Sequence, residues 1–399
     1  MTTGGDAMAS RERGISAWRR HLIDAGYTAD ALKRWLGISV LDDIGVLNHA
    51  PALERVRPDQ SPAAIAIQLF FLEADVRARQ LMAVLPRQAR ELLLNAAALQ
   101  MRAGTVRARV RIDPFGGHYV LADRRFRAVD RGALHLPGRD PVYPPSSDSV
   151  ILRDAIVAGG AGSVLDLCTG SGVQALQQAV NAAQVVAVDI NPRAVAMARL
   201  NAQLNAIDNL EVRCGDLYEP VGDTRFDLIV ANPPFVASPH TRSPAYHAGG
   251  PTGDRVLRRI IGGFGARLRA GGRAFAISHV AVRARHTLEE VAAAWFRGFP
   301  GRAAVLVLES GTPVDLAAAQ SLFALDRGLS AYALEVMRWV AYLRRHRIQT
   351  VSLVLIVAER RGRRTVEIVQ AQPRILPLPL SPPAGDRVRS WLHAEKGTA

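Results

Sequence analysis

A regular alternation of short apolar runs and helical patterns between residues 163 and 278 is the feature that most constrains the fold of this chain. Apolar runs of strand length occur at residues 163–167, 185–189, 210–214, 226–231 and 274–278. Helical spacing of apolar residues lies between them, at 173–181, 194–204 and 255–268, the last behind Asp254 as a helix cap. Strands that alternate with helices predict a parallel sheet with helices on both faces. The sequence therefore predicts an α/β domain over residues 150–370.

Two further apolar runs, at residues 303–308 and 351–358, predict the last strands of the same sheet. Between them, at about 310–348, lies an insertion with a helical pattern over 331–345. With the five earlier runs, the expected sheet has seven strands. Residues 371–399 are expected to form a C-terminal extension.

The first third of the chain has a different pattern. Residues 1–10 are small and polar, which predicts a disordered tail, and residues 11–135 are expected to form an N-terminal domain. Apolar residues recur at helical spacing from Ile15 to about Met101, and Ser61-Pro62 supplies a helix start.

A predicted β-hairpin ends this N-terminal domain. Between residues 106 and 112, apolar residues alternate with arginines, which predicts a half-buried strand with a basic outer face. Residues 118–122 return as its partner strand after a glycine turn. Helices followed by a hairpin are typical of a winged helix, a module that binds nucleic acid in some proteins and caps a substrate in others. The proline-rich residues 136–149 predict a linker.

The charge of the chain bears on its partners. Lys and Arg number 50 against 36 Asp and Glu, for a net charge of +14, and only Lys33 and Lys396 are lysines. Such a charge attracts polyanions, so nucleic-acid contact and a merely solvated basic surface both fit it.

Cysteine content and hydropathy exclude several other classes. Two cysteines cannot form a disulfide framework or a four-cysteine zinc site, and they fit a reducing cytoplasm. No apolar run approaches the roughly 18 residues of a membrane span, and the N-terminus has no apolar signal core. The histidines are scattered, with no ligand spacing; His247 is the best candidate for a catalytic role and His279 is expected to be structural. We therefore expect a cytoplasmic protein without a membrane segment or a bound metal.

The first motif with chemical meaning follows the predicted strand 163–167. In the run Asp-Leu-Cys-Thr-Gly-Ser-Gly, which begins at Asp166, Gly170 and Gly172 allow close approach of the backbone to a ligand. The helix that follows offers free N–H groups to an anionic group. The same spacing fits a dinucleotide loop, so a nicotinamide-dependent oxidoreductase is an alternative at this point.

The next two predicted strands also have an acidic residue at or just after their C-terminal ends. Asp189 follows the second strand, where it can accept both hydroxyls of a ribose, while Asn191 before Pro192 is the better helix cap. Asp216 follows the third strand, where it can accept from an exocyclic amine such as that of adenine.

The fourth motif, Ala231-Asn232-Pro233-Pro234-Phe235, is the most specific one in the chain. The double proline stiffens the backbone and presents carbonyl groups without competing N–H groups. A side-chain amide, a fixed carbonyl and an aromatic ring therefore converge at the end of the fourth strand. These groups suit the binding of a planar NH2 group, which argues against the oxidoreductase.

In this order the four motifs resemble those of class I S-adenosylmethionine-dependent methyltransferases of the Asn-Pro-Pro-Phe/Tyr group. That group includes N-methyltransferases of protein glutamine, ribosomal-RNA guanine and DNA adenine. The resemblance covers residues 141–280 most strongly, and it leaves the helical, winged-helix-like N-terminal module as an addition. It implies a Rossmann-like α/β fold with a seven-stranded, mostly parallel sheet, and S-adenosylmethionine as the cofactor.

The resemblance also implies roles for individual residues. Asp166, Gly170 and Gly172 would line the methionine part of the cofactor, Asp189 would hold the ribose and Asp216 the adenine. The implied cofactor-binding set is completed by Thr169, Ile190, Leu217 and Asn232. Asn232 and the Pro233 carbonyl would accept hydrogen bonds from the target nitrogen, and Phe235 would stack on the target plane. Tyr143 belongs to a run, 141–149, similar to the loop that covers the methionine end in glutamine methyltransferases.

The acceptor stays open between a protein glutamine, a ribosomal-RNA base and a small metabolite. One alternative is a tailoring enzyme of secondary metabolism, including intramolecular chemistry on S-adenosylmethionine that transfers no methyl group. Another is a non-catalytic module that binds nucleic acid, but this does not explain four cofactor motifs in order. The expected function is therefore methyl transfer from S-adenosylmethionine to a planar nitrogen.

Overall fold

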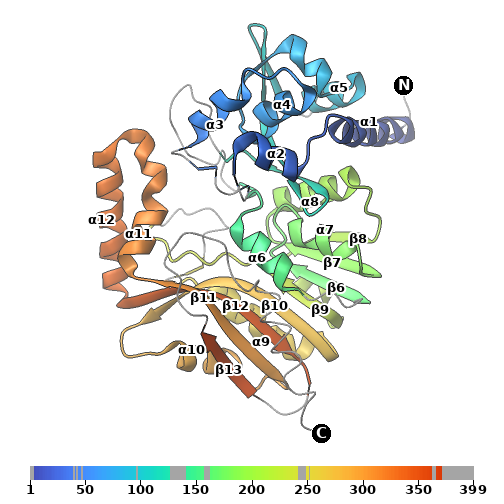
Figure 1. Ribbon diagram of the computed structural model, residues 1–399. Coiled ribbons are helices and arrows are strands. Elements are labelled where there is room, and N and C mark those ends of the chain that lie inside the picture. The colour runs from blue at the N-terminus through green and yellow to red at the C-terminus, as the bar shows by residue number, and fades with distance from the viewer. Residues whose placement is uncertain are drawn as a thin grey trace.

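A computed structural model gives the architecture of the chain (Figure 1). It describes residues 4–38, 41, 44–45, 48–95, 98–125, 141–156, 162–240, 249–250, 252–361 and 365–370. Helices of the N-terminal region lie above a large sheet in this view, and a pair of helices rises from one side of that sheet. The expected C-terminal extension, His247 and residues 136–140 of the proline-rich linker lie outside the described residues.

The N-terminal region combines helices with a small sheet. Its helical elements are α1 (Gly4–Asp24), α2 (Ala29–Leu36), α3 (His49–Val56), α4 (Pro62–Ala66), the π-helix η2 (Ile67–Phe71), the 3-10 helix η3 (Ala78–Ala83) and α5 (Arg87–Asn95). Ser61 caps α4 as predicted, since its hydroxyl accepts from the Ala64 N–H at 3.3 Å. The disordered tail predicted for residues 1–10 differs from the structure, in which α1 begins at Gly4.

Strands interrupt the helical pattern that the sequence predicts up to Met101. β1 (Val76–Arg77), β3 (Thr105–Ala108) and β2 (Leu99–Arg102) form an antiparallel sheet in that order. A separate antiparallel hairpin consists of β4 (Val110–Phe115) and β5 (His118–Asp123). The single strand predicted over 106–112 was therefore wrong, because the chain changes sheet between Ala108 and Val110.

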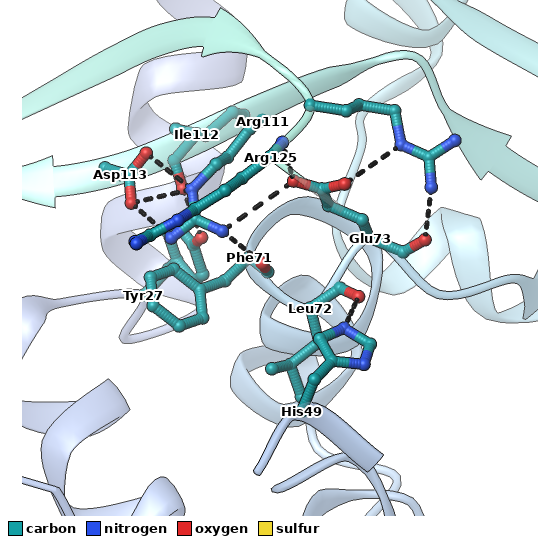
Figure 2. Close-up of polar contacts among 10 residues, drawn as sticks. Tyr27, His49, Phe71, Leu72, Glu73, Arg111, Ile112, Asp113 and Arg125 are labelled. Atoms are coloured by element: carbon teal, nitrogen blue, oxygen red, sulfur yellow. Dashed lines mark hydrogen bonds and ion pairs between the residues drawn. The ribbon is translucent and has the colours of Figure 1, made fainter. Parts of the chain in front are cut away.

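This change of sheet also reverses the predicted orientation of Arg111. The side chain is 2% exposed instead of solvated, and its Nε and Nη2 donate to the Asp113 carboxylate at 2.8–3.0 Å. Its guanidinium lies over the Phe71 ring and donates to the Phe71 carbonyl at 2.8 Å, among the contacts of Figure 2. A buried cation requires such partners, so the alternation of arginines was a misleading signal here.

The large sheet has the strand order β13-β11-β12-β10-β9-β6-β7-β8. Its strands are β6 (Ser163–Leu167), β7 (Gln184–Asp189), β8 (Leu210–Cys214), β9 (Phe226–Ala231), β10 (Leu268–Arg283), β11 (Arg302–Gly311), β12 (Ile348–Glu359) and β13 (Thr365–Gln370). β8, β7, β6, β9 and β10 are parallel, whereas β12 is antiparallel to both of its neighbours. The prediction of a mostly parallel Rossmann-like sheet is confirmed, with eight strands instead of seven because β13 adds an edge.

Alternate residues of these strands pack on opposite faces, as the period of a strand requires. Leu165, Val186 and Ile229 share a core with helix α9 (Arg255–Arg267). Their neighbours Val164, Val185 and Val230 belong to the core on the other face, which includes side chains of three helices. These are α6 (Ser147–Ala155), α7 (Val173–Ala179) and α8 (Pro192–Leu204). Helix α10 (Leu288–Trp295) packs beside α9.

The insertion between β11 and β12 forms a helical hairpin of α11 (Pro313–Ser321), the 3-10 helix η6 (Leu322–Arg327) and α12 (Leu329–Arg345) (Figure 1). At the other end of the catalytic region, α6 begins at Ser147, so the predicted linker 136–149 becomes helical before its last residue. Among the described helices, none combines the length and hydropathy needed to cross a membrane.

Candidate active site

A cavity of about 740 Å³ opens at the carboxyl ends of the parallel strands. The register brings these ends together, since Leu167 pairs with Val188 and Ala231, and Asp189 pairs with Cys214. Most residues predicted for the site line this cavity: Tyr143, Asp166, Thr169, Gly170, Asp189, Ile190, Asp216, Leu217, Asn232, Pro233 and Phe235. A volume of this order is typical of a site for a small-molecule ligand.

Gly172 differs from this set because it is not among the lining residues. Its φ of 84° favours glycine, and a Cβ there would meet the Ala198 Cβ at 3.0 Å. Gly172 thus allows the glycine loop to pack closely on α8, and the ligand contact that the resemblance implies for it stays a prediction.

Asp189 and the glycine loop hold each other in place. One carboxylate oxygen of Asp189 accepts from the Gly170 N–H at 2.8 Å, and the other from the Asn191 N–H at 2.9 Å. Burial raises the pKa of Asp189, and these two bonds oppose that rise. Asn191 caps α8 through the Arg193 N–H at 2.9 Å, as predicted. A carboxylate has about four acceptor positions, so Asp189 can accept a ribose hydroxyl in addition to these backbone N–H groups.

Asp166 lies at the end of β6 and is 1% exposed. Its Oδ2 accepts from the Thr169 hydroxyl at 2.6 Å and from the Ala175 N–H at 3.1 Å. Burial nevertheless raises the pKa of Asp166 to about 7. A carboxyl group in a cavity wall that titrates near pH 7 suits a binding site for a positively charged group.

Asp216 is already paired on the side of α9. Its two oxygens accept from Arg259 Nη1 at 3.1 Å and Nη2 at 2.8 Å. Arg259 also lines the cavity, and no local motif in the sequence predicts this. An amine at this end would have to share the carboxylate with the guanidinium.

Asn232 is oriented by Asp148, a residue that the sequence analysis did not select. Asn232 Nδ2 donates to Asp148 Oδ2 at 3.0 Å, while Asp148 Oδ1 accepts from the Ser149 N–H at 2.7 Å. A carboxylate only accepts, so it fixes the NH2 group of the amide on its own side and leaves Asn232 Oδ1 as an acceptor. The location of Asp148 in the run 141–149 was the available signal.

Phe235 lies beside His279 of β10, with ring centroids 4.9 Å apart. His279, which was expected to be structural, is among the residues that line the cavity. Burial lowers the pKa of His279, with a smaller opposing effect of Asp148. Its neutral ring and the aromatic face of Phe235 thus border the same end of the cavity as Asn232.

Gln174 supplies a further polar group that the sequence did not indicate. It is 2% exposed, and its Nε2 donates to the Ser149 carbonyl at 2.8 Å. Its Oε1 is buried without a hydrogen-bond partner in the described structure, and the residue lines the cavity. A buried acceptor of this kind is costly unless a ligand or water donates to it. With Asp166, Asp189 and the cavity volume, it fits a cofactor that carries an ammonium group and a ribose.

Comparison with known proteins gives two family matches and several relatives. A model described as methyltransferase small domain matches residues 147–295, and a domain of unknown function, DUF7059, matches residues 24–109. Release factor glutamine methyltransferase of Geobacter sulfurreducens is 35% identical over 146 residues, which are 36% of this chain and 49% of that protein. The enzyme of the same name from Xylella fastidiosa is 32% identical over 193 residues, covering 45% of this chain and 68% of that one.

Among solved structures, the T. thermophilus 16S rRNA N2 G1207 methyltransferase in complex with AdoMet and guanosine is 23% identical. The match covers 51% of this chain and 55% of that one, with a TM-score of 0.33. The chain spans about half of the length of the Geobacter relative. The family match lies on the region that carries the cavity. This chain belongs to the class I S-adenosylmethionine-dependent methyltransferases.

Proposed function

We propose that the chain transfers a methyl group from S-adenosylmethionine to a planar nitrogen, and that this nitrogen is the side-chain amide of a protein glutamine. One observation carries the proposal: Asp148 turns the Asn232 amide so that its oxygen remains an acceptor beside Pro233 and Phe235. An acceptor site for an NH2 group needs such oxygens and a flat apolar surface.

The cofactor would be held by the wall of carboxylates. Asp189 would accept from the ribose hydroxyls, and Asp216 with Arg259 would border the adenine. Asp166 and the unpaired Gln174 oxygen would receive the ammonium group of the methionine part. When bound, S-adenosylmethionine supplies a methyl group that its sulfonium has already activated.

The remaining task of the protein is to orient the acceptor and exclude water. Asn232 Oδ1 and the Pro233 carbonyl would accept the two N–H bonds, which turns the nitrogen lone pair away from them. Phe235 would stack on the amide plane. His279 is kept neutral by burial, so a ring nitrogen is available to accept the proton that the nitrogen loses.

A protein glutamine is the acceptor class that the relatives support, since those described above are named release factor glutamine methyltransferases. The resulting N-methyl amide is neutral once the proton has left, so the site needs no countercharge for the product. The free thiols of Cys168 and Cys214 support a reducing compartment, and we propose the cytoplasm.

The test uses S-adenosylmethionine with a labelled methyl group and, as acceptors, release factors and ribosomal proteins with their glutamine-to-alanine variants. We expect label in a protein that loses it when one glutamine is replaced, with S-adenosylhomocysteine as the nucleoside product. Label in ribosomal RNA or in a small molecule would replace the acceptor class. Methylthioadenosine formed without any acceptor would instead support the intramolecular alternative and contradict methyl transfer.

A further inference from the structure

The hairpin β4–β5 belongs to two cores at once. Ile112, Tyr119 and Leu121 pack into the core of the N-terminal region. Phe115 and Val120 pack with Val173, Leu176 and Ala202, which belong to α7 and α8 of the catalytic region. Two faces of one ribbon therefore connect the N-terminal region to the helices that carry the glycine loop and the ribose site.

The structure assigns to Asp123, the last residue of β5, the role of a positioning residue for the cofactor site. We propose that it couples the N-terminal region to two walls of the cavity, the loop around Tyr143 and the first turn of α8. This proposal rests on the proposed use of S-adenosylmethionine and goes beyond it by adding the N-terminal region to the cofactor site.

Asp123 contacts both walls directly. Its Oδ2 accepts from the Val142 N–H at 2.8 Å, and its own N–H donates to the Val142 carbonyl at 3.0 Å. Tyr143, the next residue, lines the cavity. The Asp123 carboxylate also accepts from Arg193 Nη1 at 2.9 Å and Nη2 at 2.8 Å. Arg193 lies in the first turn of α8, two residues after the Asn191 cap.

Amide side chains at the C-terminal end of α8 fix the position of the hairpin. Asn201 pairs with both backbone groups of Leu121, at 2.8 Å each, and also donates to the Ser171 carbonyl in the glycine loop at 2.7 Å. Asn205 pairs in the same way with Tyr119, at 2.7 and 2.8 Å. These paired bonds resemble those of a neighbouring strand, so α8 and β5 cannot slide past each other without breaking them.

The other side of the hairpin is anchored by a buried charge cluster in the N-terminal region, which Figure 2 shows. Glu73, at a φ of 56° and 1% exposed, accepts from the Arg125 N–H at 2.6 Å and from Arg124 Nε at 3.2 Å. Arg111 lies 3.7 Å from the same carboxylate. Residues 124 and 125 directly follow Asp123, so this cluster fixes the chain on leaving β5 and thereby the direction of the Asp123 side chain.

Loss of the Asp123 contacts should affect the affinity for the cofactor more than the rate of methyl transfer. The Asp123 side chain is 6% exposed, and an amide in place of the carboxylate removes the charge and one of the two oxygens that accept from the Val142 N–H and from Arg193. The loop before α6 and the start of α8 then lose a shared anchor, whereas Asn232, Phe235 and His279 keep theirs. Preorganised walls reduce the cost of ordering on binding, so their loss weakens the complex.

The test compares Asp123→Asn with Asp75→Asn. Asp75 forms a matched two-point pair with Arg107, at 2.5 and 2.7 Å, in the N-terminal region, and it is not among the residues that line the cavity. For Asp123→Asn we expect S-adenosylhomocysteine binding, measured by calorimetry, to weaken about tenfold. Hydrogen exchange at Val142 and Tyr143 should accelerate by a similar factor. The Michaelis constant for the acceptor should stay unchanged, and Asp75→Asn should resemble the wild type in all three.

The test also covers a variant that does not fold and a wild type that does not bind S-adenosylhomocysteine. If Asp123→Asn does not fold, Arg193→Gln replaces it, because the Arg193 side chain is 51% exposed, and we expect about a threefold loss of affinity. A folded variant with unchanged exchange at Val142, or with wild-type affinity in a protein that binds, would overturn the role of Asp123. If the wild type binds no S-adenosylhomocysteine, the proposed function fails, and the exchange comparison alone decides whether Asp123 positions the loop.

Discussion

The helical hairpin α11–α12 contributes Gln320 to the lining of the cavity, whereas the β-hairpin β4–β5 supports the cavity from outside, through segments that line it. The two hairpins also make different kinds of contact. The β-hairpin is held by directional hydrogen bonds from Asp123, Asn201 and Asn205. The helical hairpin meets the acceptor motif through an apolar cluster, in which Ala317 and Trp339 pack with Val236 and Phe235.

The two additions also lie at different ends of the cavity. The β-hairpin is linked to the glycine loop and to the first turn of α8, whereas the helical hairpin adjoins the Asn-Pro-Pro-Phe motif. Directional bonds fix orientation, while apolar packing tolerates small shifts. We therefore expect changes near the β-hairpin to alter cofactor affinity and changes near the helical hairpin to alter use of the acceptor. Substitutions at the two ends test this division.

The largest effect is expected from Asn232→Ala at the acceptor end. The change removes one acceptor for the target NH2 and leaves Asp166 and Asp189 untouched. Loss of such a partner in a dry site costs about 10²–10³ in turnover. Single-turnover rates and calorimetry with S-adenosylhomocysteine measure the two quantities, and affinity should stay within a few-fold.

Asn232→Asp is the stricter control, because it keeps an acceptor but adds charge beside a sulfonium and faces Asp148. Turnover at the wild-type rate in both variants would make Asn232 a structural turn residue. If both variants instead lose the cofactor, the acceptor motif shapes the cofactor pocket and the division between the two ends fails.

Asp189→Ala at the cofactor end should weaken S-adenosylhomocysteine binding by about 1.5–3 kcal/mol, the scale of hydrogen bonds to a charged group. The variant would lose the hydrogen bonds to the ribose hydroxyls and also the bond that Asp189 accepts from the Gly170 N–H. Calorimetry on the folded variant measures it. Wild-type affinity would remove Asp189 from the ribose role.

The pH dependence of cofactor binding tests Asp166. Its pKa is raised to about 7, and a cationic ligand favours the ionised carboxylate and lowers that pKa on binding. Affinity for S-adenosylhomocysteine should therefore rise by up to about tenfold per pH unit below about pH 7 and level off above it. Asp166→Asn should remove this dependence. A falling or flat profile in the wild type would separate Asp166 from the ammonium group.

Trp339→Phe in α12 should have the smallest effect. The Trp339 indole donates to Glu335 at 3.1 Å, and Glu335 also contacts His240, which follows the acceptor motif. Phenylalanine keeps the apolar packing but loses this bond, so the Michaelis constant for the acceptor should rise by about two- to fivefold. Affinity for S-adenosylhomocysteine should not change; if it falls as much, the helical hairpin is not specific to the acceptor end.

The local pattern of apolar residues was enough to predict most strands of the catalytic region. The strands β6 and β9 have the predicted bounds, since a buried parallel strand is a continuous apolar run that ends at a turn. Once strand order follows from alternation, the residues after each strand must meet at one edge. Asp166, Asp189, Asp216 and Asn232 therefore line one cavity.

The polar pairs between distant segments could not be predicted in this way. Asp148 and Asn232 are 84 positions apart, and Asp123 and Arg193 are 70 apart. Arg111 is buried, although the alternation of apolar residues and arginines predicted that it faces solvent. The change of sheet after Ala108 that causes this is not encoded in hydropathy.

The α/β class, the order of the strand-end motifs and the strand-end groups that line the cavity follow from local sequence pattern. The packing of distant segments joins the N-terminal region to the glycine-loop end of the cavity through β5 and places Asp148 where it orients Asn232. Periodicity reports only which face of an element is apolar. The choice among distant polar partners is made when packing removes water and each buried donor or acceptor must be satisfied by whatever lies next to it.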